Sequence, residues 1–219
     1  MTSYSVIAID GPAASGKSSV ARELARQLGF VYVNSGAMYR AVTWHVLSKH
    51  VDLADAAGIA RLVDSAHIVC DLTGNEVRVF IDQENPVEFL RDDRVNRGVS
   101  LVSSVPRVRE ILVERMRSYA SQHDLVMEGR DIGSVVFPRT PYKFYIDASP
   151  EVRLRRRAAE GQQDEIAARD RADSSRRASP LIIAPDAHVV DSSNMSIQEV
   201  VDEIIRQLNA KGLSRDLRA

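Results

Sequence analysis

The N-terminal part of the chain alternates between short apolar runs and a stretch of helical period. Residues 4–9 form an apolar run typical of a buried strand, and residues 11–16 are rich in turn-forming residues. Apolar side chains then recur with helical spacing over 17–28, which predicts a helix ended by the glycine that follows it. A second strand is predicted at 30–33 and a second helix at 35–48. This βαβ order predicts a parallel sheet with helices on both faces.

The middle of the chain follows a different pattern. Residues 67–72 and 77–81 are two β-like runs separated by the turn sequence Thr-Gly-Asn-Glu. This arrangement predicts a small antiparallel hairpin rather than another βα unit. A third short strand is expected around Val87. We therefore interpret residues 63–97 as an insert in an α/β domain.

The remainder of the chain returns to alternating helices and strands. Helices are predicted at 92–104 and 106–121, and strands at 125–127, 143–146 and 188–190. A further helix is expected to begin after Ser149, and a last amphipathic helix follows the capping box of Ser196 and Glu199. The last helix is expected to pack in the core.

One stretch is far more polar than the others. Residues 151–177 carry eight arginines and six acidic residues. The pattern predicts a charged helical hairpin with little apolar surface to bury. Because few buried contacts would hold it, we expect it to be the most mobile part of the chain.

Composition narrows the class of protein. The chain has 219 residues, of which 44% are hydrophobic, and a net charge of −1, which excludes a disordered chain and a bulk polycation for nucleic acid. Its single cysteine, Cys70, excludes an internal disulfide and a multi-cysteine metal site, so a cytoplasmic location is expected. No apolar run approaches the ~18 residues of a membrane span. The apolar stretch 6–9 is too short for a signal peptide.

Arginine dominates the basic residues. Of 29 lysines and arginines, only Lys17, Lys49, Lys143 and Lys211 are lysine. Arginine binds phosphate and carboxylate through a planar fork of donors. A genome-wide base-composition bias would produce the same excess. The positions of the arginines, rather than their number, therefore distinguish a role in anion binding from such a bias.

The strongest motif lies between the first strand and the first helix. The segment 11–18 has the pattern Gly-x-x-x-x-Gly-Lys-Ser of a phosphate-binding loop. Its glycines allow backbone N–H groups to surround an anion, and the following helix N-terminus adds partial positive charge. Lys17 is expected to reach the β- and γ-phosphates of a nucleotide, and the Ser18 hydroxyl to ligate Mg²⁺. The chain is thus expected to bind a nucleoside triphosphate with Mg²⁺.

Three classes of phosphate-loop protein compete at this point. A GTPase needs a guanine-reading Asn-Lys-x-Asp sequence, and none of the four lysines lies in one. A regulatory ATPase usually has a longer chain or further domains. The short length, the insert and the arginine-rich hairpin favour a kinase for a small acceptor, which must close over two anions and exclude water.

Four segments then occur in a characteristic order. They are the loop 11–18, Ser-Gly-Ala-Met-Tyr-Arg at 35–40, Glu-Gly-Arg-Asp-Ile-Gly-Ser-Val-Val-Phe-Pro at 128–138 and Arg-Asp-Arg-Ala-Asp-Ser-Ser-Arg at 169–176. Over nearly its whole length the chain resembles bacterial cytidylate kinases, of the nucleoside-monophosphate kinase superfamily. The resemblance implies transfer of the γ-phosphoryl group of ATP to CMP or dCMP, with Mg²⁺ and without a covalent intermediate.

The same resemblance implies an architecture. It predicts an α/β fold with a three-layer P-loop kinase core, a five-stranded parallel sheet, a small antiparallel β insert and a helical lid. The core would comprise residues 1–62 and 98–219, the monophosphate-binding insert 63–97, and the arginine-rich lid 151–177. We expect a monomer that binds no nucleic-acid polymer and no membrane.

The resemblance also assigns roles to individual residues. The ATP-binding residues are expected to be Gly11, Pro12, Ala13, Ala14, Ser15, Gly16, Lys17, Ser18 and Ser19. Residues expected to bind CMP are Ser35, Arg40, Ser100, Arg109, Arg130, Asp131, Arg169 and Asp173. Within that set, Ser100, Arg109 and Asp131 match side chains that read cytosine, and Arg169 and Asp173 match a pair that contacts the ribose. Lys17, Arg130, Arg153, Arg156, Arg157 and Arg176 are expected to act on the transferring phosphoryl group, while Arg40, Arg130 and Arg176 match arginines that hold phosphate.

Simpler explanations stay open for several of these residues. Arg130 follows a buried strand, where ligands bind in parallel sheets, but an ion pair with Glu128 or Asp131 would explain it too. Arg40 and the lid arginines would also suit solvated helix faces. Glu128 is suited to act on hydrated magnesium or, equally, to pair with Arg130. Other acceptors such as UMP, AMP or a non-nucleotide, and a nucleotide-gated interaction protein, are the alternative functions.

Overall fold

The sheet runs through the middle of the molecule. The structure is a computed structural model that describes residues 4–159, 170 and 180–213. Its strands are β1 (Val6–Asp10), β2 (Val31–Asn34), β3 (Ile68–Thr73), β4 (Glu76–Ile81), β5 (Leu125–Gly129), β6 (Tyr142–Asp147) and β7 (His188–Asp191). Their order in the sheet is β3-β4-β2-β5-β1-β6-β7, and every pairing except β3–β4 is parallel. The motifs at 11–18 and 128–138 lie at the carboxyl ends of β1 and β5.

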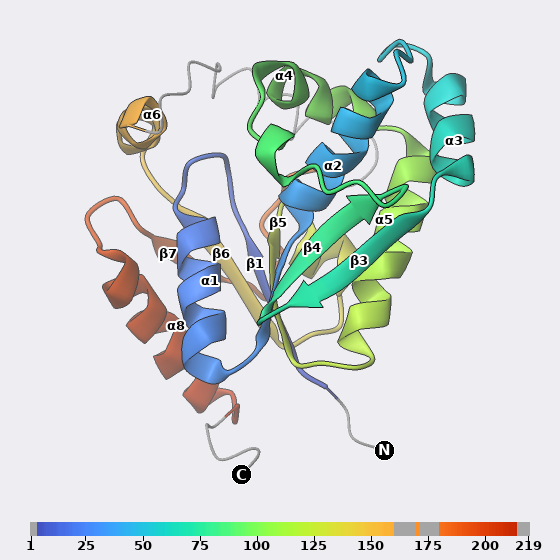
Figure 1. The fold of residues 1–219 in the computed structure, drawn as a ribbon. Coiled ribbons are helices and arrows are strands. Elements are labelled where there is room, and N and C mark those ends of the chain that lie inside the picture. Colours follow the sequence, from blue (N-terminus) through green and yellow to red (C-terminus); the bar gives the residue numbers. More distant parts are fainter. Residues whose placement is uncertain (1–3, 160–169, 171–179, 214–219) are drawn as a thin grey trace.

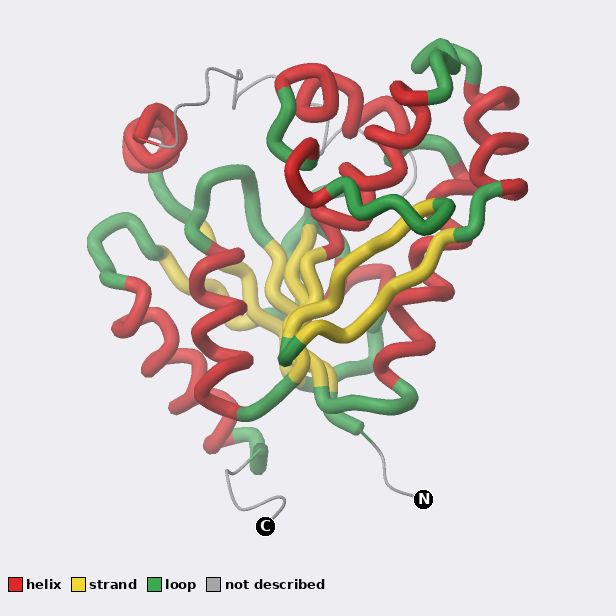
Figure 2. The backbone as a smooth tube through the Cα atoms, in the orientation of Figure 1, coloured by secondary structure: helices red, strands yellow, loops and turns green. Residues whose placement is uncertain are grey.

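The helices cover both faces of this sheet. They are α1 (Lys17–Leu28), α2 (Ser35–Ser48), α3 (Ala56–Ser65), α4 (Asp93–Val102), α5 (Pro106–Ala120), α6 (Pro150–Ala159) and α8 (Ile197–Ala210), with the single turns η1 (Val87–Phe89) and η2 (Ile132–Val136). Figure 1 shows α1 and α8 on one side and α2 to α5 on the other. The tube view of Figure 2 shows the yellow strands converging between these two groups. The predicted three-layer arrangement is confirmed.

The alternation of side chains along β1 explains why two cores form. Ile7 and Ile9 pack with α1 and α8, whereas Ala8 lies in the core shared with α2 and α5. Successive side chains of a strand point to opposite faces, so one apolar strand supplies both layers. The five strands β2, β5, β1, β6 and β7 form the predicted parallel core.

The hairpin of β3 and β4 extends the main sheet. β3 and β4 pair antiparallel from Ile68↔Ile81 to Thr73↔Glu76, as the sequence predicts. β4 then joins β2 in parallel through the pair Tyr32↔Glu76. The hairpin therefore forms the outer edge of a seven-stranded sheet.

Three local predictions differ from the structure. The expected strand around Val87 is wrong: the segment is the single 3₁₀ turn η1, in which Phe89 N–H donates to Pro86 O at 2.9 Å. The Asn85 side chain accepts from Val87 N–H at 3.1 Å, so turn-forming residues occupy backbone groups that a strand would need. Helix α3, capped by Asp55, and the π-helical turn η2 were not predicted.

Other predicted elements are confirmed with small changes of boundary. Helices α1 and α2 have the predicted bounds, and Gly29 ends α1 with a φ of 71°. The capping box of Ser196 and Glu199 starts α8. Of the predicted polar hairpin 151–177, the structure describes only residues 151–159 and 170. Within the described part of the chain, no helix is both long enough and apolar enough to cross a bilayer.

Candidate active site

The phosphate-binding loop connects the carboxyl end of β1 to the first turn of α1. Gly11 passes so close to β6 that a Cβ there would lie 2.1 Å from Ile146 O, and Gly16 starts α1 with a left-handed φ of 87°. No other residue type would fit the first position without moving the strand. The Ser15 hydroxyl is buried with no hydrogen-bond partner among the described residues. This unused polar group and the helix N-terminus make the loop a ready anion site.

The predicted ATP-binding residues come together here. Gly11, Pro12, Ala13, Ala14, Ser15 and Gly16 form the loop, while Lys17, Ser18 and Ser19 open α1. Lys17 is buried at 6% exposure, and its Nζ donates to Pro12 O at 2.8 Å. Its ammonium group is therefore held inside the loop.

A carboxylate from the neighbouring strand faces Ser18. The Ser18 hydroxyl donates to Glu128 Oε1 at 2.7 Å, and the Tyr32 hydroxyl donates to the same oxygen at 3.4 Å. Burial, the largest effect, and the nearby Glu128 carboxylate raise the pKa of Tyr32, so its hydroxyl remains a donor. The pairing of Ser18 with Glu128 favours the magnesium interpretation of Glu128. Hydroxyl and carboxylate oxygens are the hard donors that Mg²⁺ prefers.

The second cluster lies at the end of β5 and on α5. Arg109 Nη2 donates to Asp131 Oδ2, and both side chains are buried, at 8% and 6% exposure. The guanidinium carbon of Arg109 lies 5.5 Å from the ring centre of Tyr39 on α2. Because burying an ion pair costs desolvation, a buried pair that lines an open cleft is a feature typical of a binding site.

These clusters line one cleft of about 530 Å³. It is lined by the predicted residues Ser35, Arg40, Ser100, Arg109, Arg130 and Asp131, together with the loop residues Ala13, Ala14, Gly16, Lys17, Ser18 and Ser19. The cleft exposes eight cationic side chains and four carboxylates: Lys17, Arg22, Arg40, Arg78, Arg91, Arg109, Arg130 and Arg157 against Glu76, Glu88, Glu128 and Asp131. This excess of positive charge suits a ligand with several anionic groups.

The start of α2 is fixed to the end of β5. Ser35 Oγ donates to Glu128 O at 2.8 Å, and Asn34 caps the helix by accepting from Ala37 N–H at 2.8 Å. Arg40 lies one turn further along and donates through Nε to Asn96 of α4 at 3.5 Å. The helix thereby holds Arg40 at the wall of the cleft formed with α4.

Helix α6 contacts the phosphate-binding loop. Arg156 Nη1 donates to Ser15 O at 3.2 Å, and its Nη2 donates to Ser192 O at 2.8 Å. Arg153 donates to Ala13 O at 3.3 Å and pairs with Asp170. Arg157 lines the cleft. Arg153 and Arg156 of α6 thus contact the phosphate-binding loop, and Arg157 lines the cleft beside it.

The turn η2 closes the end of β5. Asp10, the last residue of β1, accepts from Ile132 N–H and Gly133 N–H, each at 2.8 Å. Burial, which outweighs these two backbone bonds, raises the pKa of Asp10 to about 6. The carboxylate is therefore ionised at neutral pH and tied to the turn that follows Asp131.

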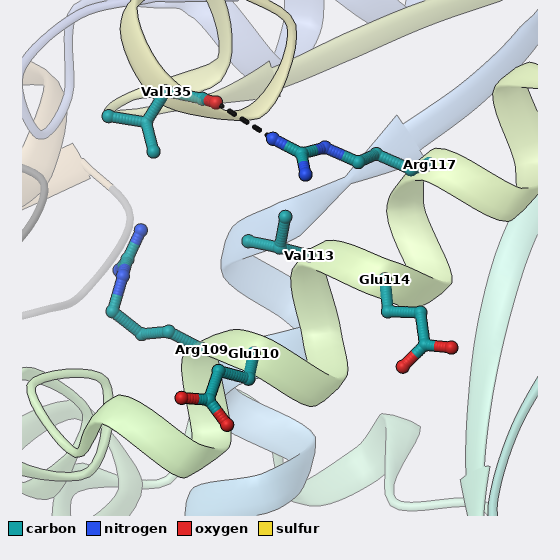
Figure 3. A pocket seen from close by; sticks show the side chains of 6 residues that line it. All are labelled: Arg109, Glu110, Val113, Glu114, Arg117 and Val135. Atoms are coloured by element: carbon teal, nitrogen blue, oxygen red, sulfur yellow. Dashed lines mark hydrogen bonds between the residues drawn. The ribbon is translucent and has the colours of Figure 1, made fainter.

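A second hollow of about 460 Å³ is lined by residues of α5 and by Val135, and it shares Arg109 with the cleft. Figure 3 shows its lining, with Arg117 of α5 donating to Val135 O of η2, a contact of 3.2 Å. None of the phosphate-loop residues lines it. We therefore place the chemistry in the larger cleft.

Some predicted and unpredicted residues need separate mention. Arg169, Asp173 and Arg176 lie outside the described residues. Asp10, Tyr39, Asp170 and Ser192 were assigned no role from the sequence, although Tyr39 and Asp170 lie within two of the quoted motifs. Asp10 ends an apolar strand directly before the loop, which was an available signal, whereas the contacts of the other three depend on pairings between distant segments.

Comparison with known proteins decides the family. The family model described as cytidylate kinase matches residues 7–210. A cytidylate kinase from Pelotomaculum thermopropionicum is 48% identical, with 96% of this chain and 98% of the relative covered. The chain belongs to the cytidylate kinase family. The phosphoryl transfer from ATP to CMP or dCMP that the motifs imply is thereby confirmed for this family.

Further relatives agree with this assignment. Cytidylate kinases from Mycolicibacterium paratuberculosis and Desulforamulus reducens are 45% and 42% identical, each with 94% of this chain and 97% of the relative covered. Among solved structures, a protein from Thermus thermophilus has a TM-score of 0.50 at 21% identity, covering 96% of this chain and 98% of that one. An uncharacterised protein from Eubacterium ventriosum has a TM-score of 0.52 at 13% identity, covering 94% and 99%. At these identities the two structures support the fold alone.

Proposed function

We propose that this chain transfers the γ-phosphoryl group of ATP to CMP or dCMP within the 530 Å³ cleft, giving ADP and CDP or dCDP. One observation carries the residue assignment. The buried pair Arg109–Asp131 and the phosphate-binding loop line the same cleft, which supports a site that binds a base at one group and phosphates at the other. Two anionic substrates would then meet between them.

The donor nucleotide is expected to occupy the phosphate-binding loop. Loop N–H groups and Lys17 would hold its β- and γ-phosphates. Mg²⁺ would be held by the Ser18 hydroxyl and by water molecules that donate to Glu128, a donor set that suits this ion. When bound, the ion would neutralise phosphate charge. The 2.7 Å contact between Ser18 and Glu128 supports this assignment.

The acceptor is expected to lie between α2, α4 and the end of β5. Arg40 and Arg130 would hold its phosphate through bidentate hydrogen bonds. By family resemblance, Arg169 and Asp173 would contact the ribose and Arg176 a phosphate. The hairpin and the segment around η1 also line the cleft, which supports residues 63–97 as a monophosphate-binding insert.

Base recognition is assigned to the cluster around α5. Cytosine presents an amino donor where uracil presents a carbonyl acceptor. The Asp131 carboxylate only accepts hydrogen bonds, so it would favour cytosine and oppose uracil. Arg109 and Ser100 would serve the neighbouring ring acceptors. The family resemblance assigns the same three residues to this role.

Catalysis would rest on alignment and charge neutralisation. The acceptor is already an anionic phosphate oxygen, so no covalent intermediate is needed. Lys17, Arg130 and the lid arginines 153, 156, 157 and 176 would stabilise the charge that spreads over the transferring group. The contacts of Arg153 and Arg156 with loop carbonyls support a position close to the γ-phosphate.

An acceptor screen tests this proposal. Purified protein with ATP and Mg²⁺ is expected to form ADP only with CMP or dCMP, at a kcat/KM at least roughly a hundredfold above that with UMP. Preferential turnover of UMP, AMP or a non-nucleotide acceptor would redirect the assignment. ADP formation without any acceptor would favour a nucleotide-gated interaction protein instead.

The Asp131→Asn variant tests the base-reading role. An amide can turn its NH₂ group toward the uracil carbonyl, so the CMP to UMP ratio of kcat/KM should narrow by about tenfold or more. If Asp131 served only to orient Arg130, both substrates would slow alike and their ratio would not change. A cytoplasmic location and a monomeric state remain predictions.

A further inference from the structure

The turn after β5 is capped in an unusual way. The first N–H groups of a helix have no acceptor within the helix, and an aspartate at the N-cap position usually accepts from one of them. Asp131 is the N-cap residue of η2, yet its side chain makes no capping hydrogen bond. Its carboxylate pairs with Arg109 instead.

Asp10 supplies the missing acceptors from another strand. Its Oδ1 accepts from Ile132 N–H and its Oδ2 from Gly133 N–H, both at 2.8 Å. The residue is only 5% exposed. Both carboxylate oxygens are thus committed to the two N–H groups that follow Asp131.

The packing at Gly133 allows this approach. A Cβ at Gly133 would lie 3.4 Å from Asp10 Oδ2 and 3.2 Å from the side chain of Lys143. The charges of Asp131 and Arg130 act on the Asp10 carboxylate, whereas the Lys143 ammonium group binds Pro138 O and Asp186. Asp10 therefore lies within the charged frame of the acceptor site although it does not line the cleft.

The far end of the turn has its own anchor. Arg117 donates to Val136 O at 3.0 Å and to Val135 O at 3.2 Å, a contact drawn in Figure 3. The turn is held at both ends, but only the Asp10 end adjoins Asp131. Loss of the Asp10 anchor is therefore expected to change the position of the Asp131 carboxylate.

We propose that Asp10 is a positioning residue for acceptor specificity: it occupies the N–H groups of Ile132 and Gly133 and so leaves the Asp131 carboxylate free for Arg109 and the acceptor base. The inference rests on the proposed function. When Asp10 cannot accept from both groups, the Asp131 carboxylate is the local acceptor that a helix N-cap normally uses. Capping would then draw Asp131 away from Arg109 and from the base.

The variant Asp10→Asn tests this competition. An amide oxygen accepts from one N–H, while the NH₂ group faces the other. CMP and UMP are supplied together, so that the product ratio reports the ratio of kcat/KM and is independent of the folded fraction. We expect the CMP preference to fall by about tenfold or more, mainly through a higher KM for CMP, with the KM for ATP within about threefold of wild type.

Asp124→Asn is the matched control. Asp124 Oδ1 accepts from Ser5 N–H at 2.7 Å beside the opposite end of β1, so it is also a carboxylate that binds a backbone donor. The only effect expected of this variant is a lower melting temperature. Its ratio of kcat/KM for CMP over UMP should equal that of wild type. If the Asp10→Asn protein does not fold, the same ratio is measured in Asp10→Ser, which also lacks the second acceptor oxygen.

The outcomes separate the two proposals. A wild-type ratio in Asp10→Asn or Asp10→Ser would overturn the positioning role, as would an equal narrowing in Asp124→Asn. A wild-type enzyme without a preference for CMP would overturn the proposed function, and this inference with it. A narrowed ratio confined to the Asp10 variants supports both.

Discussion

Lys17 shows how one buried side chain is prepared for an anion. The residue is only 6% exposed, and its ammonium nitrogen lies 2.8 Å from Pro12 O. A lysine in this position gains a strong partner when phosphates arrive, because the loop supplies backbone donors around the same anion. Its main contribution is therefore expected in the nucleotide complex rather than in the free protein.

We accordingly predict that Lys17→Met abolishes phosphoryl transfer and leaves the fold intact. Charge stabilisers at a transferring group are worth several kcal/mol, so turnover should fall by more than roughly a hundredfold. Lys49→Met, at an exposed position, is the control and should keep wild-type turnover. Steady-state assays and melting temperatures of both variants check this. More than a tenth of wild-type turnover in Lys17→Met would refute the role.

Asp10 makes stability depend on pH. Its pKa in the folded protein is about 6, raised mainly by burial, against 3.8 for an unperturbed aspartate. The folded state therefore binds more protons between these values, and the contribution of Asp10 to stability falls as pH rises through this window.

From pH 5 to pH 7 the free energy of unfolding of wild type should fall by about 1 kcal/mol relative to Asp10→Asn. Urea unfolding of both proteins at the two pH values measures this difference, and subtraction of the two proteins cancels the other titrating groups. If the free energy of unfolding of wild type minus that of Asp10→Asn stays constant or grows with pH, the raised pKa of Asp10 is contradicted.

At the scale of the element, α6 links the phosphate-binding loop to the end of β7. Arg156 contacts Ser15 of the loop and Ser192 after β7, while the Ser192 hydroxyl itself donates to Ser15 O at 2.8 Å. The neighbouring Arg155 is exposed. Helical spacing thus separates an arginine that reaches the loop from one that faces solvent.

This contrast gives a matched pair of variants. We expect Arg156→Gln to lower kcat by about tenfold or more, because it removes a positive charge and the guanidinium hydrogen bonds to Ser15 and Ser192 beside the phosphate-binding loop. Arg155→Gln should leave kcat within about twofold of wild type. Steady-state kinetics at saturating ATP and CMP decides it. Equal effects of the two variants would show that only the general charge of α6 matters.

At the scale of the whole molecule, an aromatic contact joins η1 to helix α2. Trp44 on α2 stacks on Phe89 of η1, with ring centres 5.8 Å apart and planes at 14°. Trp44 is the single tryptophan of the chain. Because η1 borders residues that line the cleft, the stack lies beside the proposed acceptor site.

We therefore expect CMP to change the tryptophan fluorescence of the protein. Closure of the insert over the acceptor would alter the packing of Phe89 on Trp44. Titration with CMP in the absence of ATP measures the signal, and Phe89→Leu, which removes the stack, should reduce it while CMP still binds by calorimetry. An unchanged signal in Phe89→Leu would place the origin of the fluorescence change elsewhere.

The sequence alone determined those features that depend on neighbouring residues. The period of apolar side chains, Gly29 and the box of Ser196 and Glu199 predicted helices with correct starts or ends, because capping and amphipathicity are local. The phosphate-binding loop was equally predictable, since its glycines, lysine and helix N-terminus act within one short segment. The family resemblance added roles for distant residues such as Arg109 and Asp131.

Only the tertiary structure determined the contacts between residues that lie far apart in the sequence. Sequence pattern did not show that the hairpin would extend the main sheet through Tyr32 and Glu76, because that pairing spans 44 residues. Nor did it show that Glu128 would face Ser18, or that Asp10 would cap a turn that begins 122 residues later. Local patterns report the periodicity of one element, whereas these contacts depend on how parallel strands bring their carboxyl ends to a common edge.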